Sequence, residues 1–341
     1  MKKKSTILLF ILLFVIAVII FLWDIVTGPV FIPFQEILSI IFNNKDTDSA
    51  SSIILLQSRL PKAITAVLAG AALPIAGLMM QTYFRNPVAG PDILGVSAGA
   101  SLFVAFVMLS AGTVFSVYAY NSFTIIIAAI IGSAIMLLII LAVAYKIKDA
   151  VTLLIFGLMF GMAISAVVGI LQYYSEKGAL KLFILWTFGS LGGVTWQQLY
   201  LLAPLVVLGV ISSLFLSKKL NLLLLGENYA RSLGLNMQQI KYTIIFITAL
   251  LTGSVTAFCG PIAFVGIAVP HLARMLFRTN DHFILIPASV LLGIIILLIC
   301  DIITRAAGDS GILPLNSITA IMGAPFVIYI LWKNQHMKRI F

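Results

Sequence analysis

The side chains that most often perform catalysis or bind metal ions are few and widely separated in this sequence. The three histidines, His271, His282 and His336, are too scattered to form a local metal-binding motif. Cys259 and Cys300 lie in apolar stretches, without CxxC spacing or a neighbouring histidine, which favours a packing role. The sequence contains no GxxxxGK[ST] phosphate loop, no HExxH zinc motif and no GxSxG nucleophile motif. We therefore predict that the chain is not an enzyme and binds neither a metal ion nor a cofactor.

Charged residues are also nearly absent from the interiors of the long apolar segments. Asp301 is the main exception, and Arg305 follows it by four residues, a spacing at which two side chains can pair on a helix. Carriers that use a proton or sodium gradient usually have ionisable groups inside their membrane-spanning helices. The chain thus has no evident energy source of its own. Two classes remain: a self-contained secondary transporter or channel, and a transporter subunit that a partner powers.

The composition indicates that lipid is the solvent for much of the chain. Hydrophobic residues make up 62% of its 341 residues, charged residues only 9%, and the mean hydropathy is +1.16. Soluble domains carry roughly 25% charged residues. The net charge of +10 does not predict nucleic-acid binding, because the basic residues are spread among apolar blocks and form no phosphate-binding patch.

Ten segments are apolar and long enough to cross a bilayer as helices, which takes about 20 residues each. The sequence therefore predicts an all-α polytopic membrane protein with a single permease domain over 1–341. The predicted spans are 5–23, 63–81, 93–111, 122–144, 150–174, 196–216, 240–259, 261–277, 283–303 and 316–333. The first resembles a signal peptide but is longer than usual, and Trp23 and Asp24 follow it where a cleavage site would need small residues. We expect it to be retained.

The distribution of basic residues predicts the orientation of the spans. An even number of spans places both termini on one side of the membrane. With both termini in the cytoplasm, 15 of the 21 lysines and arginines lie inside, as the positive-inside rule requires. The outer side keeps Lys45, Arg59, Lys62, Lys177, Lys181 and Arg305. This places the long loop 24–58 outside and the loop 217–239 in the cytoplasm.

Three connecting segments have informative patterns. The inner loop 82–92 is rich in turn-forming residues, and the outer segment 175–195 contains an apolar LFILW that is too short to span. The inner loop 217–239 has apolar residues at helical spacing, with Gly226 and Gly234 as breakers. We expect two short helices there, separated by a turn.

Two similar motifs interrupt the predicted helices. AGPDILGV at 89–96 resembles CGPIAFVGI at 259–267, and the predicted topology places them at opposite membrane faces. They indicate either an inverted repeat of broken helices, as in many transporters, or the simple recurrence of Gly-Pro at helix breaks. Polar groups and turn formers mark the first break: Gln81, Asn86, Pro87 and Gly95. They border a translocation path or pack at a helix turn; both readings are open.

The stretch RLPKAITAVLAGAALPIAGLMMQTYFRNPVAGPDILGVSAGA at 59–100 resembles the signature of the FecCD family of permeases, which includes siderophore, haem and cobalamin importers. Further matches follow in family order along the rest of the chain. They are WTFGSLGGVTW at 186–196, LLGENYARSLGLN at 224–236, GPIAFVGIAVPHLAR at 260–274, the pair Asp301 and Arg305, the LP at 313–314, and GAPFVIYIL at 323–331. Mild departures are Lys62 where arginine is usual, Val88 for leucine and Asn316 for glycine.

The resemblance implies the architecture of a type II ABC importer permease in a bacterial inner (cytoplasmic) membrane, with about ten spans per subunit. It implies a homodimer of two permease copies around a central path, two cytoplasmic ABC ATPase subunits and an extracytoplasmic substrate-binding protein. The expected cargo is a ferric siderophore, haem or a corrinoid such as cobalamin. The sequence does not decide among these.

The resemblance also implies roles for individual residues. Arg59, Lys62 and Arg305 correspond to basic residues that receive acidic groups of the binding protein; the alternative is snorkelling at the lipid headgroups. The segment 224–236 corresponds to the coupling helices that seat on each ATPase; the alternative is an amphipathic helix on lipid. Its expected contacts are Leu225, Gly226, Glu227, Ala230, Arg231, Leu233 and Gly234, with an ion pair between Glu227 and Arg231.

Overall fold

The computed structural model describes residues 3–28, 30–43, 49–109, 121–147, 149–305 and 313–333. Over these ranges the secondary structure is helical, without strands. Lys45 and His336, named above, lie outside the described residues.

Each of the ten predicted spans coincides with a helix. These are α1 (Lys3–Val26), α4 (Leu60–Phe84), α5 (Val96–Leu109), α6 (Ser122–Lys146), α7 (Ala150–Tyr174), α9 (Trp196–Leu224), α11 (Met237–Cys259), α12 (Val265–Phe277), α13 (His282–Thr304) and α14 (Leu315–Lys333). In the described part of the chain, seven helices are long and apolar enough to cross a membrane alone, whereas α5, α12 and α14 supply shorter apolar stretches. The prediction of an all-α polytopic fold is confirmed.

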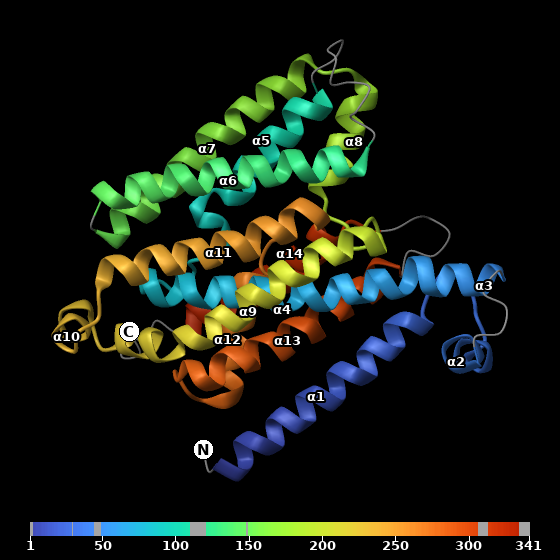
Figure 1. The fold of residues 1–341 in the computed structure, drawn as a ribbon, viewed down its shortest axis with the longest axis horizontal. Coiled ribbons are helices and arrows are strands. Elements are labelled where there is room, and N and C mark those ends of the chain that lie inside the picture. Colours follow the sequence, from blue (N-terminus) through green and yellow to red (C-terminus); the bar gives the residue numbers. More distant parts are fainter. Residues whose placement is uncertain are drawn as a thin grey trace.

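Helix α4 forms the centre of the bundle. It packs against α9, α11, α12 and α13, and nearly all of its side chains are buried (Figure 1). Small residues allow this, because lipid provides no hydrophobic drive between helices and close backbone approach provides dispersion energy instead. A Cβ on Gly70 would lie only 2.6 Å from the carbonyl oxygen of Gly293, and one on Gly77 would overlap the carbonyl of Gly266.

The remaining helices flank this centre on two sides. Helices α5, α6 and α7 form one group, which meets the centre mainly where α6 packs on α11, whereas α1 lies on the other side against α13 (Figure 1). The short helix α10 (Glu227–Ser232) and the start of α1 lie at one end of the bundle. Helices α2 (Phe34–Asn43) and α3 (Ala50–Ile53) lie at the opposite end (Figure 1). This arrangement agrees with the predicted placement of loops 24–58 and 217–239 on opposite sides.

The shorter connections also have defined structure. The π-helix η1 (Ile54–Arg59) leads directly into α4, and α8 (Lys177–Thr187) contains the apolar LFILW stretch. Because α8 has only 11 residues, it is too short to span, as expected.

The prediction of two short helices within 217–239 is wrong. Helix α9 continues to Leu224, eight residues beyond the predicted span 196–216. Leu220 and Leu223 are buried and extend the packed face of the helix over these residues. The segment therefore holds one short helix, α10. Its predicted breakers are correct: Gly226 has φ 110° and Gly234 φ 84°, values that glycine adopts without a Cβ penalty.

The two interrupted motifs meet inside the bundle. After α4 the chain turns back through the 3-10 helix η2 (Pro91–Leu94) before α5 begins, and after α11 an extended segment precedes α12. A Cβ on Gly266 would lie 2.6 Å from Cδ of Pro91, and one on Gly90 would lie 2.9 Å from Cγ1 of Ile267. The motifs therefore do not stay at opposite faces. Their origin as an inverted repeat stays a prediction.

Candidate functional site

The outer ends of three helices are joined by a buried network of charges. Arg305 at the end of α13 forms ion pairs with Asp24 of α1 (2.9 Å) and with Asp301, and Lys62 of α4 lies 2.9 Å from the other oxygen of Asp301. Arg305 also donates to the backbone carbonyls of Asp24 (2.8 Å) and Thr27. The predicted pairing of Asp301 with Arg305 is confirmed. Since neither carboxylate is exposed to water, these cations neutralise charges that the fold has buried.

Arg59, at the same end of the bundle, is also buried and bonds to the backbone at and after the end of α1. Its side chain is 4% exposed and donates to the carbonyls of Ile25 (3.1 Å), Val26 (2.7 Å) and Val30. It thus binds the carbonyls that end α1 and the start of the outer segment, where Gly28 leaves room for the guanidinium. Like Lys62 and Arg305, Arg59 lies at the end of the bundle that is predicted to face outward, but its charge points into the protein. Direct contact with a docked protein stays a prediction for all three.

Helix α10 presents a row of apolar side chains to its surroundings. Tyr229 on α10 is 55% exposed, and Leu225 and Leu233, which flank α10, are 60% and 52% exposed. Tyr229 was missed by the sequence reasoning, although its spacing from the two leucines would have identified it. Exposed aromatic and leucine side chains on a short, polar helix are typical of a protein-binding surface.

The other predicted coupling residues have different environments. Arg231 and Gly234 are exposed and Gly226 and Glu227 half-buried, whereas Ala230 is fully buried and packs within this chain. Ala230 was expected to contact the ATPase, but its buried side chain offers no surface to a partner. Glu227 and Arg231 do not form the expected ion pair; on this one-and-a-half-turn helix their side chains are free to point to water.

The root of the α10 segment is bonded to α4 and α13. The amide Nδ2 of Asn221 on α9 donates to Asp281 (2.7 Å), and its Oδ1 accepts from the backbone N–H of His282 (2.8 Å). Because this oxygen can only accept, Nδ1 of His282, 2.7 Å away, carries a proton. The opposite ring nitrogen lies 2.8 Å from the hydroxyl of Thr82 on α4. Arg85, just after α4, donates to the carbonyl of Leu223 (3.2 Å). Because α10 directly follows α9, these bonds connect the α10 segment to α4 and α13 through the end of α9.

Gln81, predicted at the translocation path, is fully buried. It donates to the carbonyl of Ile267 (3.1 Å) and accepts from Arg274 (2.6 Å), so it joins α4 to α12. The ring of His271 donates from Nε2 to the carbonyl of Pro87 (2.7 Å) and joins α12 to the loop after α4. These contacts support the alternative that the polar groups of this region pack at a helix turn.

The rest of the break between α4 and α5 is organised locally. Asn86 accepts from the backbone N–H of Val88 (3.0 Å), and Gly95 is buried with φ 69°, which ends η2 and starts α5. Asp92 on η2, which the sequence reasoning passed over, is exposed and accepts a hydrogen bond from Ser97 (2.7 Å). Asp92 and Arg85 are the charged residues of this break whose side chains are exposed.

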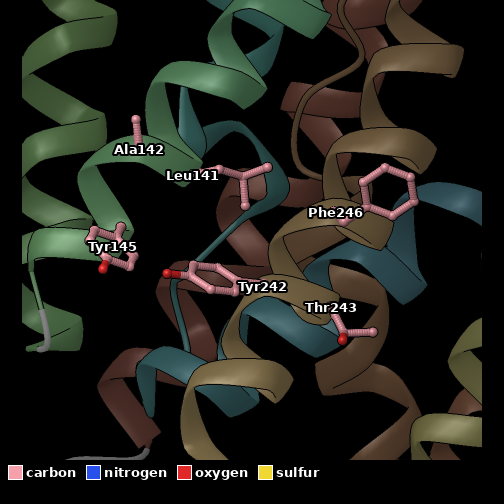
Figure 2. A pocket seen from close by; sticks show the side chains of 6 residues that line it. All are labelled: Leu141, Ala142, Tyr145, Tyr242, Thr243 and Phe246. Atoms are coloured by element: carbon pink, nitrogen blue, oxygen red, sulfur yellow. The ribbon is translucent and has the colours of Figure 1, made fainter.

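A cleft of about 620 Å³ lies between α6 and α11, near Lys241 (Figure 2). Figure 2 shows that Tyr145 and Tyr242 face each other across it. Its lining consists of Leu141, Ala142, Tyr145, Tyr242, Thr243 and Phe246. None of these side chains carries a charge at neutral pH, and the cleft is open at its rim, so a lipid chain suits it better than a polar cargo.

Comparison with known proteins identifies the family. A model of the FecCD transport family matches residues 14–333. The hemin transport system permease protein HmuU of Yersinia pestis is 34% identical over 296 residues, which cover 86% of this chain and 88% of that protein. The vitamin B12 import system permease protein BtuC of Salmonella typhi is 36% identical over 283 residues, which cover 83% of this chain and 84% of that protein.

The fold agrees with this relationship. A solved structure described as an inward-facing conformation, and assigned to the metal-chelate type of ABC transporters, superimposes with a TM-score of 0.84 at 27% identity. The match covers 95% of this chain and 99% of that one. The family motifs and the helical architecture thus lead to one conclusion: this chain belongs to the FecCD transport family and has the fold of an ABC transporter permease.

Proposed function

We propose that this chain is the membrane-spanning permease subunit of an ATP-driven importer in a bacterial inner membrane. Its cargo is an iron chelate, either a ferric siderophore or haem, or a corrinoid such as cobalamin. Membership of the FecCD family and the similarity to permeases for hemin and vitamin B12 support this cargo class. Two copies of the chain assemble with two cytoplasmic ABC ATPase subunits and an extracytoplasmic substrate-binding protein.

The observation that carries the proposal is the exposed apolar row of α10, Leu225, Tyr229 and Leu233. Helix α10 directly follows α9, whose end is bonded to Arg85 after α4 through the carbonyl of Leu223 and to Asp281 and His282 at the start of α13 through Asn221. A partner seated on this row can therefore move the bundle through the end of α9. A self-contained channel or secondary transporter does not need such a surface. We therefore assign the ATPase contact to this row, together with Arg231 and Gly234.

The binding protein docks at the opposite end, over the segment that follows α1. Arg59 and Arg305 act there by holding this segment in place through its backbone carbonyls. Lys62, whose side chain is 13% exposed, keeps Asp301 neutralised and contributes a small part of its charge to the surface. These residues thus contribute to docking mainly by fixing the conformation of the surface, and less by adding charge to it.

Uptake by cells tests the proposal. A strain that lacks this chain is supplied separately with radiolabelled haem, a ferric siderophore and cobalamin, and uptake is measured before and after the gene is restored. We expect restored uptake of at least one cargo, and loss of that uptake when the Walker lysine of the partner ATPase is replaced. Uptake that survives inactivation of the ATPase would contradict the proposal and favour a secondary transporter.

The proposed orientation has a separate test in a Cys259→Ala, Cys300→Ala background. Lys177→Cys and Ser232→Cys introduce thiols at exposed positions on opposite sides of the bundle. A membrane-impermeant thiol reagent applied to spheroplasts should label position 177 and spare position 232. The reverse labelling would place both termini outside.

A further inference from the structure

Asp92 carries a carboxyl group in a segment surrounded by helices. Its side chain is exposed, yet η2, which carries it, packs against α4, α5, α6, α7 and α11. By contrast, Asp24 and Asp301 are buried and form ion pairs with Arg305. The exposure of Asp92 therefore requires its own explanation.

Two independent contacts place η2 at membrane depth. A Cβ on Gly157 of α7 would overlap the carbonyl of Ile93, and Gly157 is seven residues into α7. On α4, Gly77 packs on Gly266, which in turn contacts Pro91, and Gly77 is seven residues before the end of α4. At 1.5 Å per residue, each count gives a depth of about 10 Å from the helix end. This is about a third of a hydrocarbon core that is roughly 30 Å thick.

The polar contacts around Asp92 are made by hydroxyl groups and not by cations. One carboxyl oxygen accepts from the hydroxyl of Ser97 (2.7 Å), and Ser97 lies 3.2 Å from the hydroxyl of Thr256 on α11. Across the described ranges, no lysine, arginine or histidine lies within ion-pair distance of Asp92. The two hydroxyl groups orient the carboxylate but add no opposite charge.

A charge at this depth is unfavourable in contact with lipid and is retained where it faces water or a bound solute. At membrane depth, irregular backbone is tolerated only where it is buried in protein or lines a water-filled cavity, and in transporters the interruptions of broken helices often line the substrate site. Asp92 lies in such an interruption, between α4 and α5. The surroundings of Asp92 thus combine membrane depth, an exposed side chain and no protein cation within ion-pair distance in the described part of the chain.

We propose that Asp92 lines the cargo path and selects by charge, so that this permease passes neutral or cationic chelates in preference to anionic ones. This inference rests on the proposed import function and narrows its cargo class. A carboxylate repels an anionic chelate during passage and attracts one that carries an ammonium group or hydrogen-bond donors. The affinity of the binding protein determines which cargo is delivered to the permease. Asp92 then determines how the charge of the cargo affects its rate of passage.

The test compares one chelate in two charge states. A ferric trihydroxamate with a free amine carries a positive charge on that arm, and its N-succinyl derivative carries a negative charge on an arm a few atoms longer. The complete complex, with ATPase and binding protein, is reconstituted into proteoliposomes, and ATP-driven uptake of both forms is measured. The ratio of anionic to cationic uptake in each variant is divided by the wild-type ratio, which cancels the preference of the binding protein.

Asp92→Asn keeps the acceptor for Ser97 and removes the charge, so we expect the ratio to rise about tenfold, which equals about 1.4 kcal/mol. The matched control Ser97→Ala removes the hydrogen bond and keeps the charge, and its ratio should stay within twofold of wild type. An unchanged ratio in Asp92→Asn, as expected for a carboxyl that is protonated in the path, would overturn the inference. An equal rise in Ser97→Ala would also overturn it, because the effect would then be structural.

A second measurement does not depend on cargo. Asp92→Cys in a Cys259→Ala, Cys300→Ala background should react with a small water-soluble thiol reagent in the assembled complex, since position 92 faces water. Absence of reaction would show that no aqueous space reaches this residue. If the wild-type complex transports no haem, ferric siderophore or cobalamin with ATP, the proposed function fails as well, whereas normal uptake with an unchanged ratio removes only the role of Asp92.

Discussion

Replacing Arg305 with methionine should destabilise the protein strongly, and the structure gives the magnitude. The side chain is 10% exposed and holds two carboxylates, Asp24 and Asp301, as well as the carbonyls of Asp24 and Thr27. Methionine keeps the apolar stem but leaves Asp24 buried without a cation. Removal of one partner from a buried ion pair typically costs about 3–5 kcal/mol. We expect Arg305→Met to lose free energy of unfolding in this range.

The assay is unfolding in mixed micelles titrated with SDS and followed by tryptophan fluorescence. Lys177→Met is the matched control, because Lys177 is an outer, exposed lysine, and its loss should change the free energy of unfolding by less than about 0.5 kcal/mol. Asp24→Asn added to Arg305→Met should recover part of the loss, with a coupling energy of about 1–3 kcal/mol.

The same variant separates a structural role of Arg305 from direct docking. A direct contact with acidic groups of the binding protein would make docking affinity less salt-dependent in Arg305→Met while stability stayed unchanged. If Arg305→Met unfolded as readily as Lys177→Met and altered only the salt dependence, the reasoning from the buried network would be refuted. We expect the opposite: lower stability, with the salt dependence of docking by properly folded protein unchanged.

Three further substitutions test the coupling surface and the packing of the bundle. Tyr229→Ala should weaken ATPase association by tenfold or more, since a truncated aromatic anchor often costs about 2 kcal/mol; in a pull-down titration Ser232→Ala on the same helix should bind normally. Gly77→Leu should prevent accumulation of folded protein, because its Cβ would overlap the carbonyl of Gly266, whereas Gly169→Leu, with open space around it, should accumulate as wild type on a detergent gel-filtration column. His282→Phe removes one hydrogen bond from Thr82 and one from Asn221 and should lower the free energy of unfolding by about 2–4 kcal/mol, measured by the same SDS titration.

The helices were predictable because their determinants are local. A run of about 20 apolar residues has few alternatives to a membrane helix, so all ten spans were identified from composition and length. Gly226 and Gly234 were recognised as breakers because positive φ angles favour glycine. The end of α9 was placed too early, since Lys218 and Lys219 suggested a loop although buried leucines follow them.

The partners of the charged residues were not predictable, because they are distant in sequence. Arg305 bonds to Asp24, 281 positions away, and the sequence offered only its neighbour Asp301 as a partner. Arg59 was expected to project outward, yet it binds backbone carbonyls that no residue pattern records. The exposure of Asp92 likewise depends on which helices surround η2, and this is a property of the packed bundle.

The most direct test of the central claim is uptake into proteoliposomes that contain the purified chain with or without its ATPase partner. The vesicles receive cargo-loaded binding protein outside, and either ATP inside or an imposed proton or sodium gradient. We predict accumulation of cargo only with the ATPase and ATP, and none from the chain alone under either gradient. Gradient-driven accumulation by the chain alone would contradict its assignment as an ATP-dependent permease subunit.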